Sequence, residues 1–410
     1  MFKRYIFDEI SRALSFSPIV LVIGGRQSGK TTLVSQFQDN ERFQYLTLDH
    51  LTELQAAQDN PESFFSLHAK PPVIVDEVQR APEIFLPMKV LVDQDRKAGQ
   101  FLLTGSANPL NLPKLADSLA GRMVILRLWP LSQGEIIGKK EQFIDAAFGD
   151  GFDDLKLASL NLEDLVHLIC VGGYPTMLSL QSERDRTDWC DAYINTLLEH
   201  DVRDLHQIEK VGNLSKMVCL LAARSGNLMN LAEVSRALGM VRTTVARYAQ
   251  ILETIFLIHL LPPWFNNLGK RIVKSPKLYF SDTGVLCRLG RHSSKYLLDN
   301  RIQLGHILEN FVVNELLKQS GYAENIVKLY HYRTQDGYEI DIILENHHGE
   351  VVAVEIKSNA SVSSDMFKTM RQFEKEMGAK FKRGIVIYTG QKAIAFGPNM
   401  VALPVQSLWS

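Results

Sequence analysis

The sequence predicts an α/β fold at each end of the chain, with helices and a winged helix between them. Three patterns support this prediction. Residues 18–37 have an apolar strand, a glycine-rich turn and an amphipathic helix, in that order. Residues 155–209 carry apolar side chains at helical spacing, whereas residues 338–358 alternate apolar and polar side chains as strands do. At 410 residues the chain is longer than one hydrophobic core usually supports, so several domains are expected.

Composition and charge exclude several classes of protein. The net charge of −1 excludes a uniformly basic nucleic-acid binder but permits a local basic surface. The four cysteines are widely spaced and form no CxxC pair, which is typical of reduced thiols rather than a disulfide or zinc framework.

The first ten residues mix charged and apolar side chains, unlike a signal peptide. Residues 251–264 are the most apolar stretch, but an acid and two prolines make them core rather than membrane. We therefore expect a soluble, cytoplasmic protein.

The glycine-rich turn has the spacing of a phosphate-binding loop. Gly24, Gly29, Lys30 and Thr31 match G-x-x-x-x-G-K-[ST], between a strand and a helix as the motif requires. Backbone N–H groups of such a loop surround phosphates. We expect Lys30 to contact the β- and γ-phosphates of ATP and Thr31 to hold Mg²⁺. The residues predicted to bind the nucleotide are Gly24, Gly25, Arg26, Gln27, Ser28, Gly29, Lys30, Thr31, Thr32 and Ser106.

A second apolar strand, at residues 73–75, ends in two acids. Asp76 is predicted to help hold Mg²⁺, as the acid at this position does in other phosphate-loop enzymes. Glu77, one residue further, is placed to polarise the attacking water. An Asp-Glu pair at the end of a strand is common by itself. Its combination with a phosphate-binding loop predicts ATP hydrolysis.

A third apolar strand, Gln100–Asn108, ends in hydroxyl and amide side chains. Thr104, Ser106 and Asn108 are each candidates to sense the γ-phosphate or to position the water. Arg122 stands in a turn before a fourth strand. Strands that end in polar residues beside a phosphate loop predict a parallel sheet with its site at the carboxyl edge.

The middle of the chain is predicted to be helical. Residues 155–209 would form a lid or adaptor. A helix then ends near Leu238, Gly239 makes a turn, and a second helix begins near Val241, which is the spacing of a helix-turn-helix. Residues 270–282 have the pattern of a small β-wing.

The predicted winged helix is locally basic. Between residues 241 and 280 the sequence has six basic residues and one acid, Glu253. They are Arg242, Arg247, Lys270, Arg271, Lys274 and Lys277. A recognition helix contacts the major groove through its N-terminal residues, which here are Arg242, Thr243, Thr244 and Arg247. The charge asymmetry favours contact with DNA. The alternative is a module that docks between domains.

The C-terminal part carries a predicted hairpin with aligned charges. A hairpin centred on His348 places Asp341 opposite Glu355. Cross-strand neighbours lie about 5 Å apart, so two carboxylates could share one divalent cation. A shift of one residue would turn the apolar face outward. The pattern therefore predicts that Asp341, Glu355 and Lys357 converge on one polar face.

This charge pattern fits phosphodiester hydrolysis. Asp341 and Glu355 would hold Mg²⁺ or Mn²⁺, which polarises the phosphate and activates a water. Lys357 would orient that water or stabilise the developing negative charge. Glu309, on the preceding helix, is a further acid and candidate metal ligand. The alternative is a scaffold that no longer cuts, in which the acids and Lys357 form an ordinary salt-bridge cluster.

The order of these motifs resembles that of bacterial and archaeal AAA-type ATPases that end in a poorly characterised nuclease-like domain. The matching stretches are "GGRQSGKTT", "VIVDEVQRAP", "LLTGSAN", "SLAGR", "LWPLSQGEI", "GGYP" and "EID…EIK". The resemblance implies an AAA-like core in which Arg122 is a sensing or trans-acting arginine, with a structural salt bridge as the alternative. The set Glu309, Asp341, Glu355 and Lys357 is similar to that of the restriction-endonuclease-like superfamily, which includes archaeal Holliday-junction resolvases. One departure is that Ile340, not proline, precedes Asp341.

Four domains follow from these observations. They are a P-loop ATPase core at 1–138, a helical lid or adaptor at 139–215, a winged helix-turn-helix at 216–292 and a restriction-endonuclease-like domain at 293–410. The predicted function is a Mg²⁺-dependent ATPase that acts on DNA, with ATP and Mg²⁺ as cofactors and a second Mg²⁺ or Mn²⁺ in a C-terminal nuclease. The alternatives are a regulatory switch that binds partners without cutting, and a remodeller of proteins. DNA and further copies of the chain are the expected partners.

Overall fold

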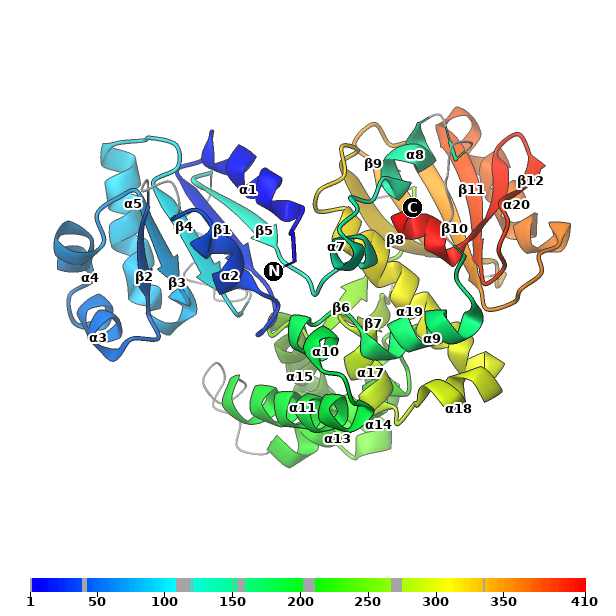
Figure 1. Cartoon of the computed structure of the whole chain (residues 1–410), viewed down its shortest axis with the longest axis horizontal. Helices are drawn as coiled ribbons and strands as arrows, with labels where there is room; N and C mark the ends of the chain where they lie inside the picture. Colours follow the sequence, from blue (N-terminus) through cyan, green and yellow to red (C-terminus); the bar gives the residue numbers. More distant parts are fainter. Residues whose placement is uncertain are drawn as a thin grey trace. The chain divides into compact units, whose positions relative to one another are not determined.

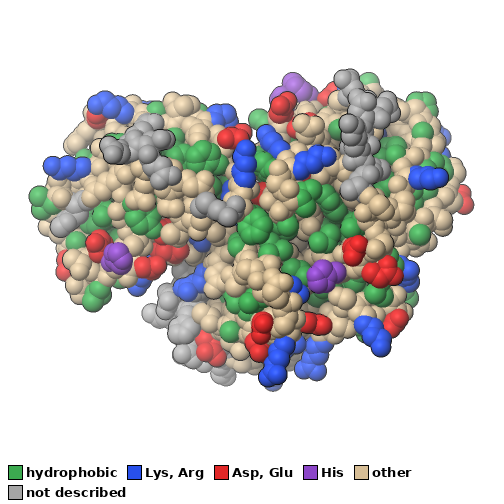
Figure 2. Space-filling view, in the orientation of Figure 1, with side chains coloured by type: hydrophobic (Ala, Val, Ile, Leu, Met, Phe, Trp, Pro, Cys, Tyr) green, Lys and Arg blue, Asp and Glu red, His purple; other side chains and the backbone are tan. Residues whose placement is uncertain are grey.

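The computed structural model describes residues 2–38, 43–107, 119, 121–149, 151–152, 159–201, 211–266, 275–334 and 336–410. The chain divides into two compact units, each described by itself. The first contains Lys3–Leu131 and Thr254–Phe256, and the second contains Ser132–Glu253 and Leu257–Ser410 (Figure 1). None of the helices in these ranges is both long and apolar enough to cross a lipid bilayer. On the face drawn in Figure 2, acidic and basic side chains are interspersed.

The first unit is built on a five-stranded parallel sheet, as the sequence predicts. Its strands are β1 (Ile19–Ile23), β2 (Gln44–Thr47), β3 (Val73–Asp76), β4 (Phe101–Gly105) and β5 (Met123–Arg127). They lie in the order β2-β3-β4-β1-β5, and every pair is parallel. The central strands β1, β3 and β4 are buried along their whole length. This explains their continuous apolar sequences, because both faces of the sheet are covered.

The connections in this unit are mostly helical. The α-helices are α1 (Ile6–Leu14), α2 (Lys30–Ser35), α3 (Leu51–Asp59), α4 (Pro61–Ser63) and α5 (Phe85–Gln94). Shorter turns are η1 (Phe64–His68), η2 (Val78–Arg80) and η3 (Pro82–Ile84). Apolar residues of α1 and α2 form one cluster with Val20 and Val22 of β1. Helix α2, which starts directly after the glycine-rich turn, is thereby fixed to the strand that precedes that turn.

The second unit begins with helices. These are α7 (Gln133–Ile137), α8 (Phe143–Phe148), α9 (Leu162–Val171), α10 (Pro175–Ser179), α11 (Glu183–Thr196), η5 (Leu197–Asp201), α13 (Val211–Ala222), α14 (Leu231–Leu238), α15 (Arg242–Thr254), α17 (Thr283–Leu289), α18 (Ser294–Asp299) and α19 (Arg301–Gln319). Gly239, with a left-handed φ of 63°, ends α14 before α15 begins. Strands β6 (Ile258–Leu261) and β7 (Lys277–Phe280) then pair in antiparallel fashion. Residues 270–274 of the predicted wing lie outside the described residues.

A six-stranded mixed sheet completes the chain. Its strands are β8 (Val327–Arg333), β9 (Glu339–Asn346), β10 (Val351–Lys357), β11 (Phe381–Tyr388), β12 (Ile394–Gly397) and β13 (Met400–Pro404), in the order β12-β13-β11-β10-β9-β8. The remaining elements are η6 (Ser364–Phe367), α20 (Lys368–Met377), η7 (Gly378–Lys380) and η8 (Val405–Trp409). Strands β9 and β10 pair with Val354 opposite Ile342. This is the register of a hairpin centred on His348, as predicted.

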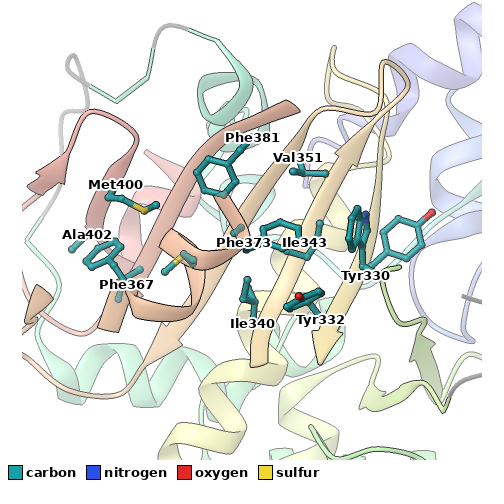
Figure 3. Close-up of a cluster of buried hydrophobic side chains, with 14 of the residues drawn as sticks. Tyr330, Tyr332, Ile340, Ile343, Val351, Phe367, Phe373, Phe381, Met400 and Ala402 are labelled. Atoms are coloured by element: carbon teal, nitrogen blue, oxygen red, sulfur yellow. The ribbon is translucent and has the colours of Figure 1, made fainter. Parts of the chain in front are cut away.

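The polar face predicted for this hairpin is confined to one end. Ile343 and Ala353 have the same strand parity as Asp341 and Glu355, yet they are fully buried. They belong to a cluster with Phe367 and Phe373, next to or within α20 (Figure 3). The reason is that α20 packs on this face of the sheet, with its Phe373 in the same cluster as Ile343. The end of the hairpin that carries Asp341 and Glu355 is partly open, as is Glu345 near the turn.

The cluster around Ile343 should carry much of the stability of the C-terminal sheet. Ile343→Ala should lower the free energy of unfolding by about 2–5 kcal/mol, because it removes buried methyl groups and leaves a cavity. The measurement is urea denaturation followed by tryptophan fluorescence, since Trp264 belongs to the same cluster. Ile326→Ala is the matched control, because Ile326 is 68% exposed and its loss should change little. Equal effects of the two substitutions would contradict the assignment of this core.

Candidate functional site

The phosphate-binding loop joins β1 to α2. Gly29 precedes the helix with a φ of 96°, a conformation that favours glycine. Gly24 also has to be glycine, because a Cβ there would lie 2.1 Å from the carbonyl oxygen of Leu128. The Lys30 side chain is buried, and its Nζ donates hydrogen bonds to the carbonyl oxygens of Gly24 and Gly25, each at 3.0 Å. The loop is therefore closed around a fixed ammonium group.

The other predicted loop residues differ in exposure. Gly25 and Ser28 are buried, whereas Arg26, Gln27 and Thr32 are exposed. Arg4, which is not part of the loop, also supports it, and the sequence did not predict this contact. Arg4 donates from Nη1 to the carbonyl oxygen of Ser28 at 3.0 Å, and from Nη2 to that of Trp129 at 2.6 Å. Arg4 precedes the motif by many residues, so no local pattern indicates this contact.

Asp76 is the centre of a hydroxyl network at the carboxyl edge of the sheet. Its Oδ2 accepts hydrogen bonds from Thr31 Oγ1 at 2.8 Å and from the hydroxyl of Tyr45 at 2.9 Å. Its Oδ1 accepts from Thr104 Oγ1. The two predicted Mg²⁺ ligands, Thr31 and Asp76, are thus in direct contact. Tyr45, which the sequence analysis did not single out, has a raised pKa because it is partly buried and lies beside the Asp76 carboxylate.

The Glu77 carboxylate is held by side chains from two segments. Its Oε1 accepts a hydrogen bond from Ser106 Oγ at 2.9 Å, and its Oε2 accepts from Gln79 Nε2. Its backbone N–H donates to Thr104 Oγ1 at 3.0 Å. Glu77 also has a φ of 62°, which is uncommon for a residue other than glycine and recurs at functional sites. Ser106 therefore contacts the predicted water-positioning acid. Asn108, the third candidate, lies outside the described residues.

Arg122 lies at the opposite edge of the sheet. Its carbonyl oxygen accepts a hydrogen bond from the backbone N–H of Ile19, the first residue of β1. The phosphate loop follows the last residue of this strand, about 15 Å away at roughly 3.3 Å per residue. The Arg122 guanidinium donates to both carboxylate oxygens of Asp93, at 2.6 and 3.0 Å. This ion pair is the structural salt bridge given as the alternative, and the distance from the phosphate loop argues against sensing of the nucleotide of its own chain. Action on a neighbouring copy stays a prediction.

The predicted DNA-contacting helix is only partly as expected. Arg242, Thr243 and Arg247 of α15 are exposed, and Thr244 is half-buried. Lys277 was counted among the basic residues of the wing, but it is buried and forms ion pairs. It does not contribute to an exposed basic surface. Lys270, Arg271 and Lys274 belong to the stretch that the structure does not describe.

The C-terminal candidate residues gather at one end of β9 and β10. Asp341 Oδ2 accepts a hydrogen bond from the backbone N–H of Ile356 at 2.8 Å. Glu355 Oε1 lies 2.6 Å from Lys357 Nζ. Glu309 Oε1, on α19, accepts from the hydroxyl of Tyr279 at 2.6 Å. Burial, and then the charge of Asp341, raise the pKa of both Glu309 and Glu355.

Lys277, the first residue of β7, lies among these acids. Its Nζ is 2.9 Å from Glu309 Oε1, 2.8 Å from Glu339 Oε1 and 3.5 Å from Asp341 Oδ1. Burial alone would lower the pKa of Lys277, but the carboxylates outweigh burial and raise it, so the side chain is an ammonium ion. Across the described ranges, no group of three or more His, Cys, Asp or Glu side chains is arranged to hold a metal ion. Two of the predicted metal ligands, Glu309 and Asp341, are therefore brought together around Lys277. The third, Glu355, pairs with Lys357.

Comparison with protein families agrees with the first site. Residues 16–137 match a family model described as an AAA domain, so the N-terminal part is an AAA-type P-loop ATPase domain. Two further models, each described as a domain of unknown function (DUF8612 and DUF4143), match residues 162–296 and 304–408. These matches support the ATPase part of the resemblance. They leave a nuclease-like C-terminal domain as a prediction.

Relatives match almost the whole chain. An uncharacterized protein of Mycobacterium tuberculosis is 30% identical over 408 residues, which is 99% of this chain and 84% of the relative. An uncharacterized protein of Mycobacterium bovis matches to the same extent. The chain belongs to the family of these mycobacterial proteins. Among solved structures, the Walker-type ATPase of Pyrococcus abyssi is similar at a TM-score of 0.43 and 13% identity, covering 70% of this chain and 96% of that chain.

The position of Arg122 generates a testable prediction. Arg122→Ala should leave the affinity for ATP and the rate of ATP hydrolysis unchanged, because the side chain lies at the edge of the sheet away from the phosphate loop. Its small effect on the melting temperature should equal that of Asp93→Ala, since each substitution removes the same exposed ion pair. A loss of ATP hydrolysis in Arg122→Ala that Asp93→Ala does not share would contradict this and indicate action on a neighbouring copy.

Proposed function

We propose that the chain is a Mg²⁺-dependent ATPase whose nucleotide cycle switches its interaction with DNA. The observation that carries the proposal is the direct hydrogen bond between Thr31 and Asp76 at the carboxyl edge of a parallel sheet. A hydroxyl and a carboxylate are the oxygen ligands that Mg²⁺ prefers. The hydrogen-bond donors to Asp76 described above are neutral hydroxyl groups, so the pair fits Mg²⁺. When bound there, Mg²⁺ would neutralise charge on the phosphates.

The loop residues supply the phosphate contacts in this proposal. Lys30 now donates to carbonyl oxygens of its own loop, which keeps the ammonium group positioned while phosphate is absent. Backbone N–H groups from Gly25 to Thr31 would bind phosphate oxygens together with Lys30. Arg4 would keep the loop in place through the Ser28 carbonyl oxygen. These roles need no movement of the sheet, because all the groups are already at one edge.

Glu77 is the acid that would accept a proton from the attacking water. Its carboxylate is oriented by Ser106 and Gln79, and its backbone is fixed by Thr104. A general base has to be both ionised and held within reach of the water. The three contacts hold the carboxylate in one orientation, which supports this role. We therefore assign Glu77 to the hydrolytic step and Asp76 to Mg²⁺.

DNA is the partner that the exposed residues of α15 favour. Arg242 and Arg247 are exposed near the start of the helix, where a recognition helix contacts DNA. The turn at Gly239 between two helices and the antiparallel pair β6 and β7 support this interpretation of the segment. For the C-terminal domain we infer binding without cutting, the switch interpretation, because Lys277 stands among the acids that a nuclease would use for metal.

The ATPase proposal predicts two separable defects. Lys30→Ala should abolish ATP binding, because the only ammonium group of the motif is lost. Glu77→Gln should bind ATP with normal affinity but hydrolyse it about 100-fold more slowly or worse, which is the usual contribution of a positioned base. The measurements are binding of a fluorescent ATP analogue and release of inorganic phosphate.

Glu83→Gln provides the control for that experiment. Glu83 is an exposed acid a few residues beyond Glu77, so its loss should change neither quantity. Normal turnover in both Lys30→Ala and Glu77→Gln would disprove the ATPase assignment. Loss of ATP affinity in Glu77→Gln would instead show that Glu77 acts in binding.

The DNA proposal predicts a change in salt dependence. If Arg242 and Arg247 each contact a phosphate, the double substitution Arg242→Ala, Arg247→Ala should weaken binding to duplex DNA. It should also reduce the slope of log K against log salt by about two, since each lost contact removes roughly 0.9 from the slope. Fluorescence anisotropy at several salt concentrations measures both. Arg184→Ala is the control, because Arg184 is an arginine of α11 that is 90% exposed. An unchanged slope in the double variant would make the helix a protein-docking element.

A further inference from the structure

The cluster at the end of β9 and β10 contains its own cation. We propose that the ammonium group of Lys277 takes the place of a divalent metal ion among Glu309, Glu339 and Asp341. While β7 is in place, the C-terminal domain then binds no Mg²⁺ or Mn²⁺ at this cluster. The inference does not depend on ATP hydrolysis, and its test uses a different measurement.

The geometry of Lys277 is that of a shared central cation. One atom, Nζ, lies within 3.5 Å of a carboxylate oxygen from each of the three acids. These acids come from α19 and β9, and the lysine comes from β7. Only 4% of the lysine side chain is exposed, compared with 14% for Glu309 and 13% for Asp341. A buried ammonium group requires such partners, because it has lost its water.

Four of the carboxylate oxygens near this cluster already accept hydrogen bonds or form ion pairs. Glu309 Oε1 is bonded by Tyr279 as well as by Lys277. Asp341 uses Oδ2 for the backbone N–H of Ile356 and Oδ1 for Lys277. Glu355, the second predicted metal ligand, is paired with Lys357. A dication entering this cluster would have to replace these donors and would be repelled by two ammonium groups.

Lys277 is also held in place by the backbone on either side. β7 pairs with β6 through Leu261 opposite Lys277, and Leu228 forms a bridge to Lys277 on another segment. Asn310 of α19 is bonded to both backbone groups of Phe280, accepting from its N–H at 2.9 Å and donating to its carbonyl oxygen at 2.8 Å. Because α19 also carries Glu309, the strand and the acid are fixed to one another. The Cα of Lys277 is therefore held next to the acids, and its side chain is buried among them.

The test is a titration of Mn²⁺ into the nucleotide-free full-length protein, followed by calorimetry and by the electron paramagnetic resonance signal of free Mn²⁺. We expect that the wild type shows no Mn²⁺ binding that depends on Asp341, as judged against Asp341→Asn. Lys277→Gln should gain one Mn²⁺ site, with affinity at least tenfold tighter than any site of the wild type. That gain should vanish in the double variant Lys277→Gln, Asp341→Asn. Lys277→Arg, which retains a cation, is the matched control and should gain nothing.

Two results would overturn the inference. One is Mn²⁺ binding by the wild type that is lost in Asp341→Asn, since the cluster would then accept metal with Lys277 in place. The other is a folded Lys277→Gln protein, verified by circular dichroism, that gains no site. If Lys277→Gln does not fold, the comparison of wild type with Asp341→Asn still decides the outcome: Asp341-dependent Mn²⁺ binding refutes the proposal, and its absence supports it.

Discussion

A carboxylate that is taken out of water has to be compensated, and both candidate sites of this chain are arranged around that constraint. In the first unit, Asp76 is almost fully buried and is surrounded by the hydroxyl groups of Thr31, Tyr45 and Thr104. In the second, Glu309 and Asp341 are compensated by Lys277. Buried charges without such partners would cost several kcal/mol each. The compensating groups therefore fix which strands and helices lie together at each site.

Much of the first site was predictable because its chemistry is local in sequence. The phosphate loop lies between one strand and one helix, and Asp76 with Glu77 directly follows another strand. The carboxyl ends of parallel strands share one edge, so these segments had to meet. The same rule places Arg122 at the other edge, because a residue that directly precedes a parallel strand lies away from the carboxyl ends. Arg4 and Tyr45 carry no such signal, since their contacts join distant parts of the chain.

In the C-terminal sheet, the register of the hairpin was predictable but its environment was not. The HHG turn and the alternation fixed Asp341 opposite Glu355, and the observed ladder has this register. The alternation also suggested one polar face, which the burial of Ile343 and Ala353 contradicts. Whether a helix covers the second face of a hairpin is set by the tertiary fold, and here α20 covers it. Lys277 was missed for a related reason. Its basic neighbours in sequence predicted that it lies on a wing. Only the tertiary fold brings it to Glu309, 32 positions later.

The two sites differ in whether their compensating group can be exchanged. At Asp76 the donors are neutral hydroxyls, and one of them, Thr31, is itself a suitable Mg²⁺ ligand. Binding of Mg²⁺ there would replace hydrogen bonds with a cation and would not require an ammonium group to leave Asp76. At Asp341 the partner is an ammonium group held by the backbone of β7. A metal ion there would need the displacement of a buried charge. The same physical requirement thus favours metal binding at the ATPase site and opposes it at the C-terminal cluster.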